Sequence, residues 1–471
     1  VVSALTLSAL MLSVGALARE VDVAKHVDQR FERYSTLAKD IWDYAELGYL
    51  EEKSSKRLQQ ELKREGFKVK TRVAEIPTAF VASFGRGRPV IGILAEFDAL
   101  PGLSQDAVPN RSPLVADGPG HACGHHLFGS ASVAAAIAVK GWLEAGGHEG
   151  TVRLYGTPAE EGGSGKVYIT RAGAFDDVDI VIHWHPSDRN RVNYRTSTAN
   201  KSGRFQFHGL AAHAAAAPDR GRSALDGVEA MNYMVNMMRE HVPSDARIHY
   251  VITDGGDAPN IVPEFAEVYY YVRHTDIEVA KALFERVVKA AEGAARGTGT
   301  TMDYEVMHGN YPVLPNETLA RLVDAKLHQL GGFEYTRDET EFARKIRETL
   351  IGVRLELGSH REIQPMEFRR GMGSTDVGDV SWMVPTIGLG TATWVPGTPA
   401  HSWQAVAAGG MSIGFKGMAL AAKAIALTAV DLFEQPEIIE AAREEFEKRR
   451  GADFEYRALL GDRDPPLDYR L

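Results

Sequence analysis

Four short segments of this sequence contain residue types that bind metal ions or transfer protons. The most informative is the run His121-Ala122-Cys123-Gly124-His125-His126, which follows a loop rich in glycine and proline. Thiolate and imidazole are strong ligands for zinc and similar ions, and a Cys-x-His spacing lets both side chains turn toward one point. Ordinary polar loop residues around a small buried cysteine are the alternative, so this segment alone is only suggestive.

The second segment is the pair Glu160-Glu161, which follows the apolar run 152–155. Adjacent side chains on an extended or turning backbone point in different directions. One carboxylate can therefore bind a metal while its neighbour faces the bound water. The alternative is a solvated acidic turn.

The third and fourth segments each offer histidine. His183 and His185 follow the apolar run 180–182, and period-two alternation puts both on the same face, so the pattern does not choose between them. His401 stands just before a long apolar stretch, where a lone histidine could equally be a capping or core residue. The acidic run 95–101 adds Asp98, which could hold a metal-binding imidazole in place from behind.

The elements that must position these residues alternate along the chain. Apolar runs at 80–84, 90–94, 152–155 and 180–182 predict buried strands, and helical patterns such as 23–66 and 130–143 lie before and between them. This alternation predicts an α/β fold with a central mixed, mostly parallel sheet flanked by helices. The four segments are each expected to follow a strand, and open α/β sheets gather their sites at the carboxyl ends of the strands. We therefore expect the segments to meet.

The pattern changes near residue 196. Strands at 204–207, 249–253 and 266–273, with helices at 223–241 and 277–296, predict a compact inserted α+β unit. We expect a discontinuous catalytic domain at 19–195 and 312–471, which ends with a long apolar helix at 411–433, and a smaller domain at 196–311. Residues 337–370 are charge-rich and are expected to form a surface excursion. The polar last 20 residues are expected to be mobile.

Composition narrows the class of protein. At 471 residues, 44% hydrophobic and 25% charged, the chain has the profile of a soluble globular protein with more than one core. Its net charge of −10 gives no electrostatic basis for binding nucleic acid or an anionic membrane, so the expected partner is a small molecule. The single cysteine, Cys123, excludes an intramolecular disulfide.

The first 18 residues carry no charge and end in a small-x-small pattern, Ala16-Leu17-Ala18, that is similar to a signal-peptidase site. We expect a periplasmic or secreted protein if residues 1–18 are a signal peptide, and a cytoplasmic one otherwise. No later transmembrane segment is predicted.

Taken in order, five segments resemble the aminoacylase and glutamate-carboxypeptidase superfamily of dinuclear metallohydrolases, and most closely the p-aminobenzoyl-glutamate hydrolase type within its amidohydrolase branch. The resemblance covers about residues 25 to 430. The matching segments are His121-Ala122-Cys123-Gly124-His125, Pro158-Ala159-Glu160-Glu161-Gly162-Gly163, Gly209-Leu210-Ala211-Ala212-His213, Pro259-Asn260-Ile261-Val262-Pro263 and Ser374-Thr375-Asp376-Val377-Gly378-Asp379. One departure is His126, which stands where much of the branch has aspartate.

The resemblance implies roles for these residues. Cys123 would bridge two divalent ions, zinc or manganese and possibly cobalt. The other metal ligands would be Glu161 and His401 at one ion, and His125 and His185 at the other. Glu160 would be the general base, and Asp98 and Asp376 would support the ligands from behind. The inserted domain would act as a lid and a homodimer surface. Its His213 would reach an active site, often the partner subunit's, and stabilise the oxyanion there. Asn260 and Arg273 would bind the substrate carboxylate, and the alternative for Arg273 is a buried salt bridge within the lid sheet.

The expected reaction is therefore hydrolysis of the amide bond of a small N-acyl amino acid, possibly with an aromatic acyl group, or of a dipeptide-like molecule. A metal-bridging hydroxide would attack the carbonyl, with Glu160 taking the proton. One alternative is a dipeptidase or aminopeptidase that uses the same site on free peptides. Another is a non-catalytic ligand-binding protein of the same fold.

Overall fold

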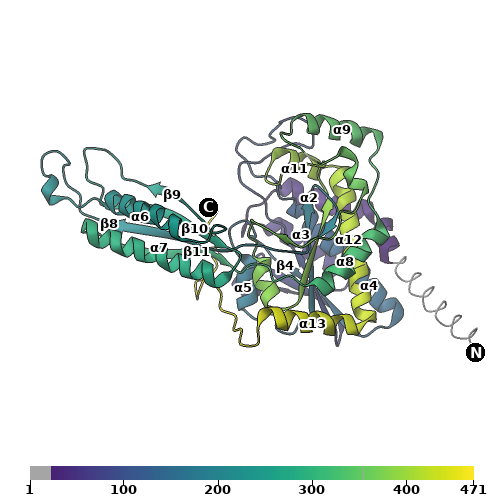
Figure 1. Cartoon of the computed structure of the whole chain (residues 1–471). Coiled ribbons are helices and arrows are strands. Elements are labelled where there is room, and N and C mark those ends of the chain that lie inside the picture. The colour runs from purple at the N-terminus through teal and green to yellow at the C-terminus, as the bar shows by residue number, and fades with distance from the viewer. Residues whose placement is uncertain (1–22, 354) are drawn as a thin grey trace, which may run out of the picture.

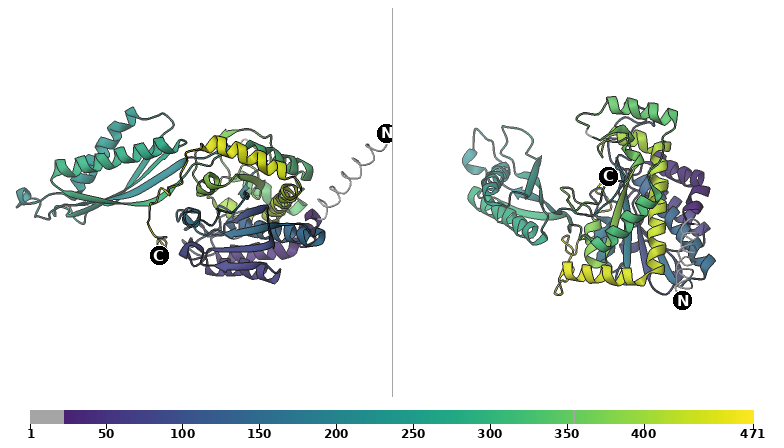
Figure 2. Two further views of the ribbon diagram at one scale, coloured as in Figure 1. Left: turned by 90° about the horizontal axis from the view of Figure 1, so that it is seen from below. Right: turned by 45° about the vertical axis from the view of Figure 1, so that its right-hand side comes forward.

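The chain forms a catalytic domain from which a narrow second domain, the lid, projects to one side (Figure 1). The structure is a computed structural model, and it describes residues 23–353 and 355–471. The signal-like segment at 1–18 lies outside the described residues. The two views in Figure 2 also place the lid beyond the edge of the catalytic domain.

The catalytic domain is built on a seven-stranded sheet with strand order β1-β2-β4-β3-β5-β13-β6. Its central strands β4, β3, β5 and β13 run parallel, whereas the pairings toward both edges are antiparallel. The expected mixed sheet is confirmed, with its parallel part at the centre. The strands are β1 (Lys68–Thr71), β2 (Phe80–Arg86), β3 (Val90–Ala95), β4 (Gly150–Gly156), β5 (Ile180–Ser187), β6 (Arg191–Val192) and β13 (Thr386–Ala392).

Two long helices, α4 (His125–Gly146) and α12 (Ser412–Glu434), pack against each other and against the central strands. Both helices are apolar on nearly all sides, as expected of helices that the rest of the domain encloses. By length and composition either could cross a membrane, but 89% and 83% of their most apolar windows are buried inside the protein. The other helices of this domain are α2 (Phe31–Tyr44), α3 (Glu52–Arg64), α5 (Gly165–Arg171), α8 (Glu317–Leu330), α9 (Arg337–Glu348), α10 (Val377–Met383), α11 (Trp403–Gly409) and α13 (Pro436–Arg450).

The lid has a four-stranded antiparallel sheet in the order β11-β8-β10-β9. Its strands are β8 (Ala199–His208), β9 (Arg247–Asp254), β10 (Phe265–His274) and β11 (Thr301–Asn310), and helices α6 (Ala224–Met238) and α7 (Ile277–Thr298) cover one face of the sheet (Figure 1). These elements share a hydrophobic core of their own. Strand β11 was not predicted from the sequence. A short parallel pair, β7 (Arg195–Thr196) with β12 (Arg369–Arg370), stands where the chain enters the lid.

The charge-rich stretch 337–370 is not simply a surface excursion, so that expectation is wrong for its first part. Thr336 and Glu339 form a capping box that starts α9. On the inner face of the helix, Phe342 and Ile346 are buried and pack against Trp394. The charges occupy the outer face, which is why hydrophobic periodicity was weak in the sequence.

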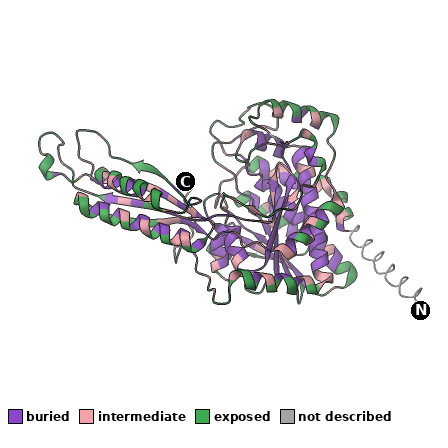
Figure 3. Cartoon of the chain, viewed as in Figure 1, coloured by how far each residue is buried: buried purple, intermediate pink, exposed green. Residues whose placement is uncertain are grey.

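The expectation of a mobile C-terminal segment is also wrong. Leu459 and Leu460 are buried, and the Tyr456 hydroxyl donates a hydrogen bond to Oδ1 of Asp379 at 2.7 Å. The other oxygen of Asp379 accepts the backbone N–H of Tyr311 at 3.0 Å. The segment is therefore packed against the catalytic domain, which Figure 3 shows to be mostly buried inside and exposed only at its periphery.

Asp379 should make stability depend on pH. Burial, with a smaller effect from the charge of Asp376, raises the pKa of Asp379 from 3.8 to about 7, although hydrogen bonds oppose the rise. The folded protein therefore holds this proton more tightly than the unfolded chain, and the resulting stability is full below about pH 4 and lost by about pH 7. We expect Asp379→Asn to gain stability relative to the parent protein as the pH rises through this range, measured by urea unfolding. The exposed control Asp257→Asn should show no such trend, and a flat difference for Asp379→Asn would contradict the argument.

Candidate metal centre and active site

The potential metal ligands predicted from the sequence meet in one place. Ligand atoms of Cys123, His125 and His185 lie within 4.8 Å of one another, and so do those of Cys123, Glu161 and His401. Cys123 is thus common to both groups. A third group of the same kind joins His125 to Glu96 and Glu160.

The Cys-x-His turn depends on Gly124. Its backbone has a φ of +78°, and a Cβ at this position would lie 2.7 Å from Cβ of Pro186. Glycine satisfies both constraints because it lacks a Cβ. The turn places Cys123 beside β5, where its Sγ lies 3.4 Å from Nε2 of His185, and places His125 at the start of α4.

Asp98 connects ligands from two segments. Its Oδ1 lies 2.8 Å from Nδ1 of His125, and its Oδ2 accepts the backbone N–H of Glu161 at 2.9 Å. Burial alone would raise the pKa of Asp98, but the charge and hydrogen bond of His125 lower it to about 2. An ionised Asp98 directs Nε2 of His125 toward the cluster, as predicted for a carboxylate behind a metal-binding histidine.

The structure separates His185 from His183. His185 lies within β5, not in the loop after it, and its Nδ1 lies 2.7 Å from the carbonyl oxygen of Pro186. With that hydrogen bond made, Nε2 is left free to face Cys123. His183 lines the same cavity but belongs to neither group that contains Cys123.

Glu160, Glu161 and His401 lie on tightly turned loops. Ala159 and His401 have φ values of +57° and +60°, which are rare for residues with a Cβ and cluster at functional sites. The backbone N–H of His401 donates to the carbonyl of Ala122, which fixes the loop. Nε2 of His401 lies 3.2 Å from Oε1 of Glu161.

Asp376 has a different neighbour from the one expected. It contacts no predicted ligand and instead accepts hydrogen bonds from the backbone and from Nζ of Lys166, a fully buried lysine. Nζ of Lys166 also lies 2.7 Å from Glu96, whose other oxygen is 3.0 Å from Nε2 of His125. Lys166 was not predicted from the sequence, although a single lysine in the apolar run Gly165–Arg171 was a usable signal.

The lid residues lie away from the cluster. His213 pairs with Ile261, and Ala214 donates to the carbonyl of Asn260, so His213 and Asn260 are neighbours. They belong to the loops beyond His208 and before Phe265, at the far end of the lid (Figure 1). Arg273 lies at the opposite end of β10, over the ring of Tyr271. None of these three predicted lid residues lines the metal cavity.

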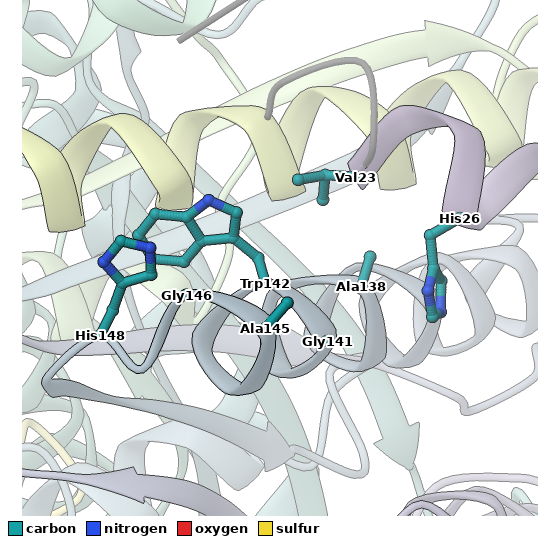
Figure 4. Close-up of a pocket in the computed structure, with 8 residues that line it drawn as sticks. All are labelled: Val23, His26, Ala138, Gly141, Trp142, Ala145, Gly146 and His148. Carbon is teal, nitrogen blue, oxygen red and sulfur yellow. The ribbon is translucent and has the colours of Figure 1, made fainter. Parts of the chain in front are cut away.

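The cluster opens into a cavity of about 220 Å³. Its lining includes Cys123, Glu160, Glu161, His185 and His401, together with residues 371–375. A separate cavity of about 370 Å³ is drawn in Figure 4. It lies near the other end of α4, roughly 20 Å along the helix from His125, and contains none of these groups. It is lined by Val23, His26, Ala138, Gly141, Trp142, Ala145, Gly146 and His148.

The cluster fits divalent ions. Nε2 of His125 and Oε1 of Glu161 are buried, and each lies close to another ionisable group, Glu96 at 3.0 Å and His401 at 3.2 Å, without a well-formed hydrogen bond to it. Burial also raises the pKa of the Cys123 thiol, so a thiolate here requires a cation beside it. Cysteine, histidine and carboxylate together are a donor set that such ions accept.

Comparison with known proteins places the chain in a family. Residues 92–402 match the model of peptidase family M20/M25/M40. The chain belongs to this family. It is 40% identical to a p-aminobenzoyl-glutamate hydrolase subunit of Escherichia coli strain K12, over 91% of this chain and 95% of that protein. It is 31% identical to Xaa-Arg dipeptidase of Mus musculus, over 90% and 91% of the two chains.

Among solved structures, a dinuclear metal-binding M20 peptidase from Bacillus subtilis superposes with a TM-score of 0.60 at 19% identity, covering 86% of this chain and 99% of that one. This likeness concerns the fold. The family and the relatives establish the present chain as a metal-dependent hydrolase of amide bonds, and the resemblance seen in the sequence is confirmed.

The C-terminal segment also reaches the site. Oη of Tyr469 and Nη2 of Arg470 both donate hydrogen bonds to the backbone carbonyl of Glu161, at 3.1 and 2.8 Å. The Tyr469 ring packs edge-on against Tyr49. The far end of the chain therefore holds the loop that carries Glu161.

Removing these two hydrogen bonds should weaken metal binding. We expect the double substitution Tyr469→Phe and Arg470→Met to lower metal affinity roughly 10- to 100-fold, the usual effect of losing groups that orient a ligand. Competition with a chelator measures it. Arg457→Met, an exposed arginine of the same segment whose side chain pairs with Glu455, is the control. Equal affinities of the double variant and the control would contradict this role.

Proposed function

We propose that this cluster binds two divalent ions. Cys123, Glu161 and His401 would hold one ion, and Cys123, His125 and His185 would hold the other. Support comes from the two ligand groups that share Cys123. Zinc, manganese and cobalt all suit these donors. When bound, such ions polarise the scissile carbonyl and lower the pKa of a water molecule.

Glu160 is proposed as the general base, which takes a proton from the attacking water and passes it to the leaving amine. It lines the cavity beside both ligand groups. Burial and the charges of Glu96 and Glu161 raise the pKa of Glu160 well above its usual value. A raised pKa suits a carboxylate that must both accept and return a proton near neutral pH.

The proposed substrate is a small N-acyl amino acid, including one with an aromatic acyl group. The observation that carries this proposal is the meeting of Cys123, Glu160, Glu161 and His401 in one cavity of about 220 Å³. This volume lies below the usual range for ligand pockets, about 300 to 1,000 Å³, which favours a small substrate over a long peptide. The 40% identical relative, which forms part of a p-aminobenzoyl-glutamate hydrolase, supports the aromatic acyl group.

A second candidate is cleavage of free dipeptides, which the relationship to Xaa-Arg dipeptidase favours. The two candidates differ in the group attached to the nitrogen of the substrate. Comparing kcat/KM for N-benzoyl-L-glutamate with that for free dipeptides ending in glutamate or arginine separates them, because a dipeptidase prefers the unblocked amine.

Substitution of Glu160 tests its role. We expect Glu160→Gln to lower kcat on N-benzoyl-L-glutamate by roughly two to four orders of magnitude, because the proton acceptor is lost. Elemental analysis should find its metal content unchanged. Cys123→Ala, the contrasting variant, should lose metal as well as activity. Full activity of Glu160→Gln would exclude Glu160 as the base.

We also propose that two copies of the chain associate through their lids, so that His213 and Asn260 of each serve the other's cavity. The edge strand β9 and helix α6 support this, because they expose large apolar side chains. These are Tyr233, Met234, Met237, Tyr250, Val251 and Ile252. Pairing of two β9 edges would extend the sheet across both copies.

A positive charge on β9 should prevent two copies of the chain from associating through this strand. We expect Val251→Lys to reduce the mass in solution from that of two chains to that of one, measured by light scattering during size-exclusion chromatography. Activity should fall with it because His213 no longer reaches a second site. Ile351→Lys, a fully exposed position on the catalytic domain, is the control. A parent protein that is already monomeric would rule out this arrangement.

A further inference from the structure

One wall of the cavity around the candidate metal ligands contains an arginine, Arg195, that has no part in the function proposed above. Arg195 belongs to β7, the two-residue strand at the base of the lid, and lines the cavity together with Ser197. The neighbouring strand β12 continues into residues 371–375, which line the same cavity. Arg195 is therefore in the same chamber as Glu160 and Cys123.

The side chain of Arg195 lacks an acidic partner. Within residues 23–353 and 355–471, it makes no ion pair and no hydrogen bond. Burial and the positive charge of Arg369 lower its pKa, and no described carboxylate acts in the opposite direction. The neighbouring arginines differ, since Arg189 pairs with Asp188 and Arg369 with Glu367.

The carboxylates of the cavity are engaged elsewhere. Glu96 pairs with Lys166, and Glu161 lies against His401. Glu160 is flanked by carboxylates and assigned to proton transfer. A half-buried guanidinium without a counter-ion is costly, and a bound anion would offset that cost. The described carboxylates therefore leave the charge of Arg195 unneutralised. An anionic ligand can neutralise it.

We propose that Arg195 is a specificity-determining residue that binds a carboxylate of the substrate. The proposal rests on the proposed function, because an N-acyl amino acid brings at least one carboxylate into this cavity. The planar guanidinium can donate two parallel hydrogen bonds to a carboxylate, which fixes the distance between that group and the scissile amide. The lid residue Asn260 lies at the far end of the lid, so Arg195 supplies this contact from within the same chain.

Substrates that lack one carboxylate at a time test the proposal. N-benzoyl-L-glutamate is compared with N-benzoyl-L-glutamine, which lacks the side-chain carboxylate, and with N-benzoyl-L-isoglutamine, which lacks the α-carboxylate. We expect Arg195→Met to lower kcat/KM on the dianion roughly 30- to 1,000-fold, mainly through KM. For one of the two amides the loss should shrink to less than about 3-fold, because the ion pair is already absent. That amide identifies the carboxylate that Arg195 binds.

Two further variants control for charge and folding. Arg195→Lys keeps the charge but loses the two-pronged geometry, so its loss should be intermediate. Arg189→Met removes an arginine of the same segment that already has an acidic partner, and it should behave like the parent protein. Equal losses on all three substrates for Arg195→Met, or no loss on any, would overturn the proposal.

A binding measurement keeps this test separate from the proposed function. Calorimetry compares N-benzoyl-L-glutamate binding to metal-loaded Glu160→Gln with binding to the double variant Glu160→Gln, Arg195→Met. We expect the second to bind at least 10-fold more weakly, as for the loss of a charged contact in a binding site. If the parent protein hydrolyses none of the three compounds, the proposed function fails, yet this comparison still decides the role of Arg195. Equal affinities would refute it.

Discussion

Several buried or half-buried carboxylates, Glu96, Glu160 and Asp376, lie around the buried lysine Lys166, and this imbalance of charge constrains the whole site. Each isolated buried charge costs several kcal/mol unless it is paired. Burial and mutual repulsion raise the pKa values of Glu51, Glu96 and Glu160. Divalent cations bound beside Cys123 would offset such a concentration of negative charge. The affinity for metal is thus a property of the surrounding carboxylates as well as of the ligands.

Hydrogen bonds hold these buried charged groups in fixed positions. Asp98 links the His125 ring to the loop of Glu161, so one carboxylate holds two candidate ligands from distant segments. The backbone carbonyl of Glu161 is in turn held by Tyr469 and Arg470. The support of one ligand therefore extends over most of the chain, from β3 to the C-terminal residues. Strained loops at Ala159 and His401 persist because this network fixes them.

Candidate functional residues occur at both ends of the lid, one near the cluster of potential metal ligands and the others far from it. Arg195 stands at the base, where the chain leaves the catalytic domain, and shares a cavity with the cluster. His213 and Asn260 stand at the far end, on a surface that one copy of the chain does not bring to its own cavity. Groups at the base can act within a single chain, whereas groups at the tip require either a large motion of the lid or a second copy.

Much of the fold and of the candidate site could be predicted from the sequence, because hydrophobic patterns are strong where a whole segment is buried. Strands of a central sheet read as apolar runs, and the runs at 80–84, 90–94, 152–155 and 180–182 all lie within strands of the structure. The residue types at Cys123, Glu160, Glu161 and His401 indicated the chemistry. Tertiary structure decided the rest: that His185 faces Cys123, which periodicity left open and only the family resemblance implied, that Asp376 meets Lys166 and not a ligand, and that Arg195 has no partner among the described residues. These depend on contacts between residues far apart in the chain, and short-range periodicity carries no information about such contacts.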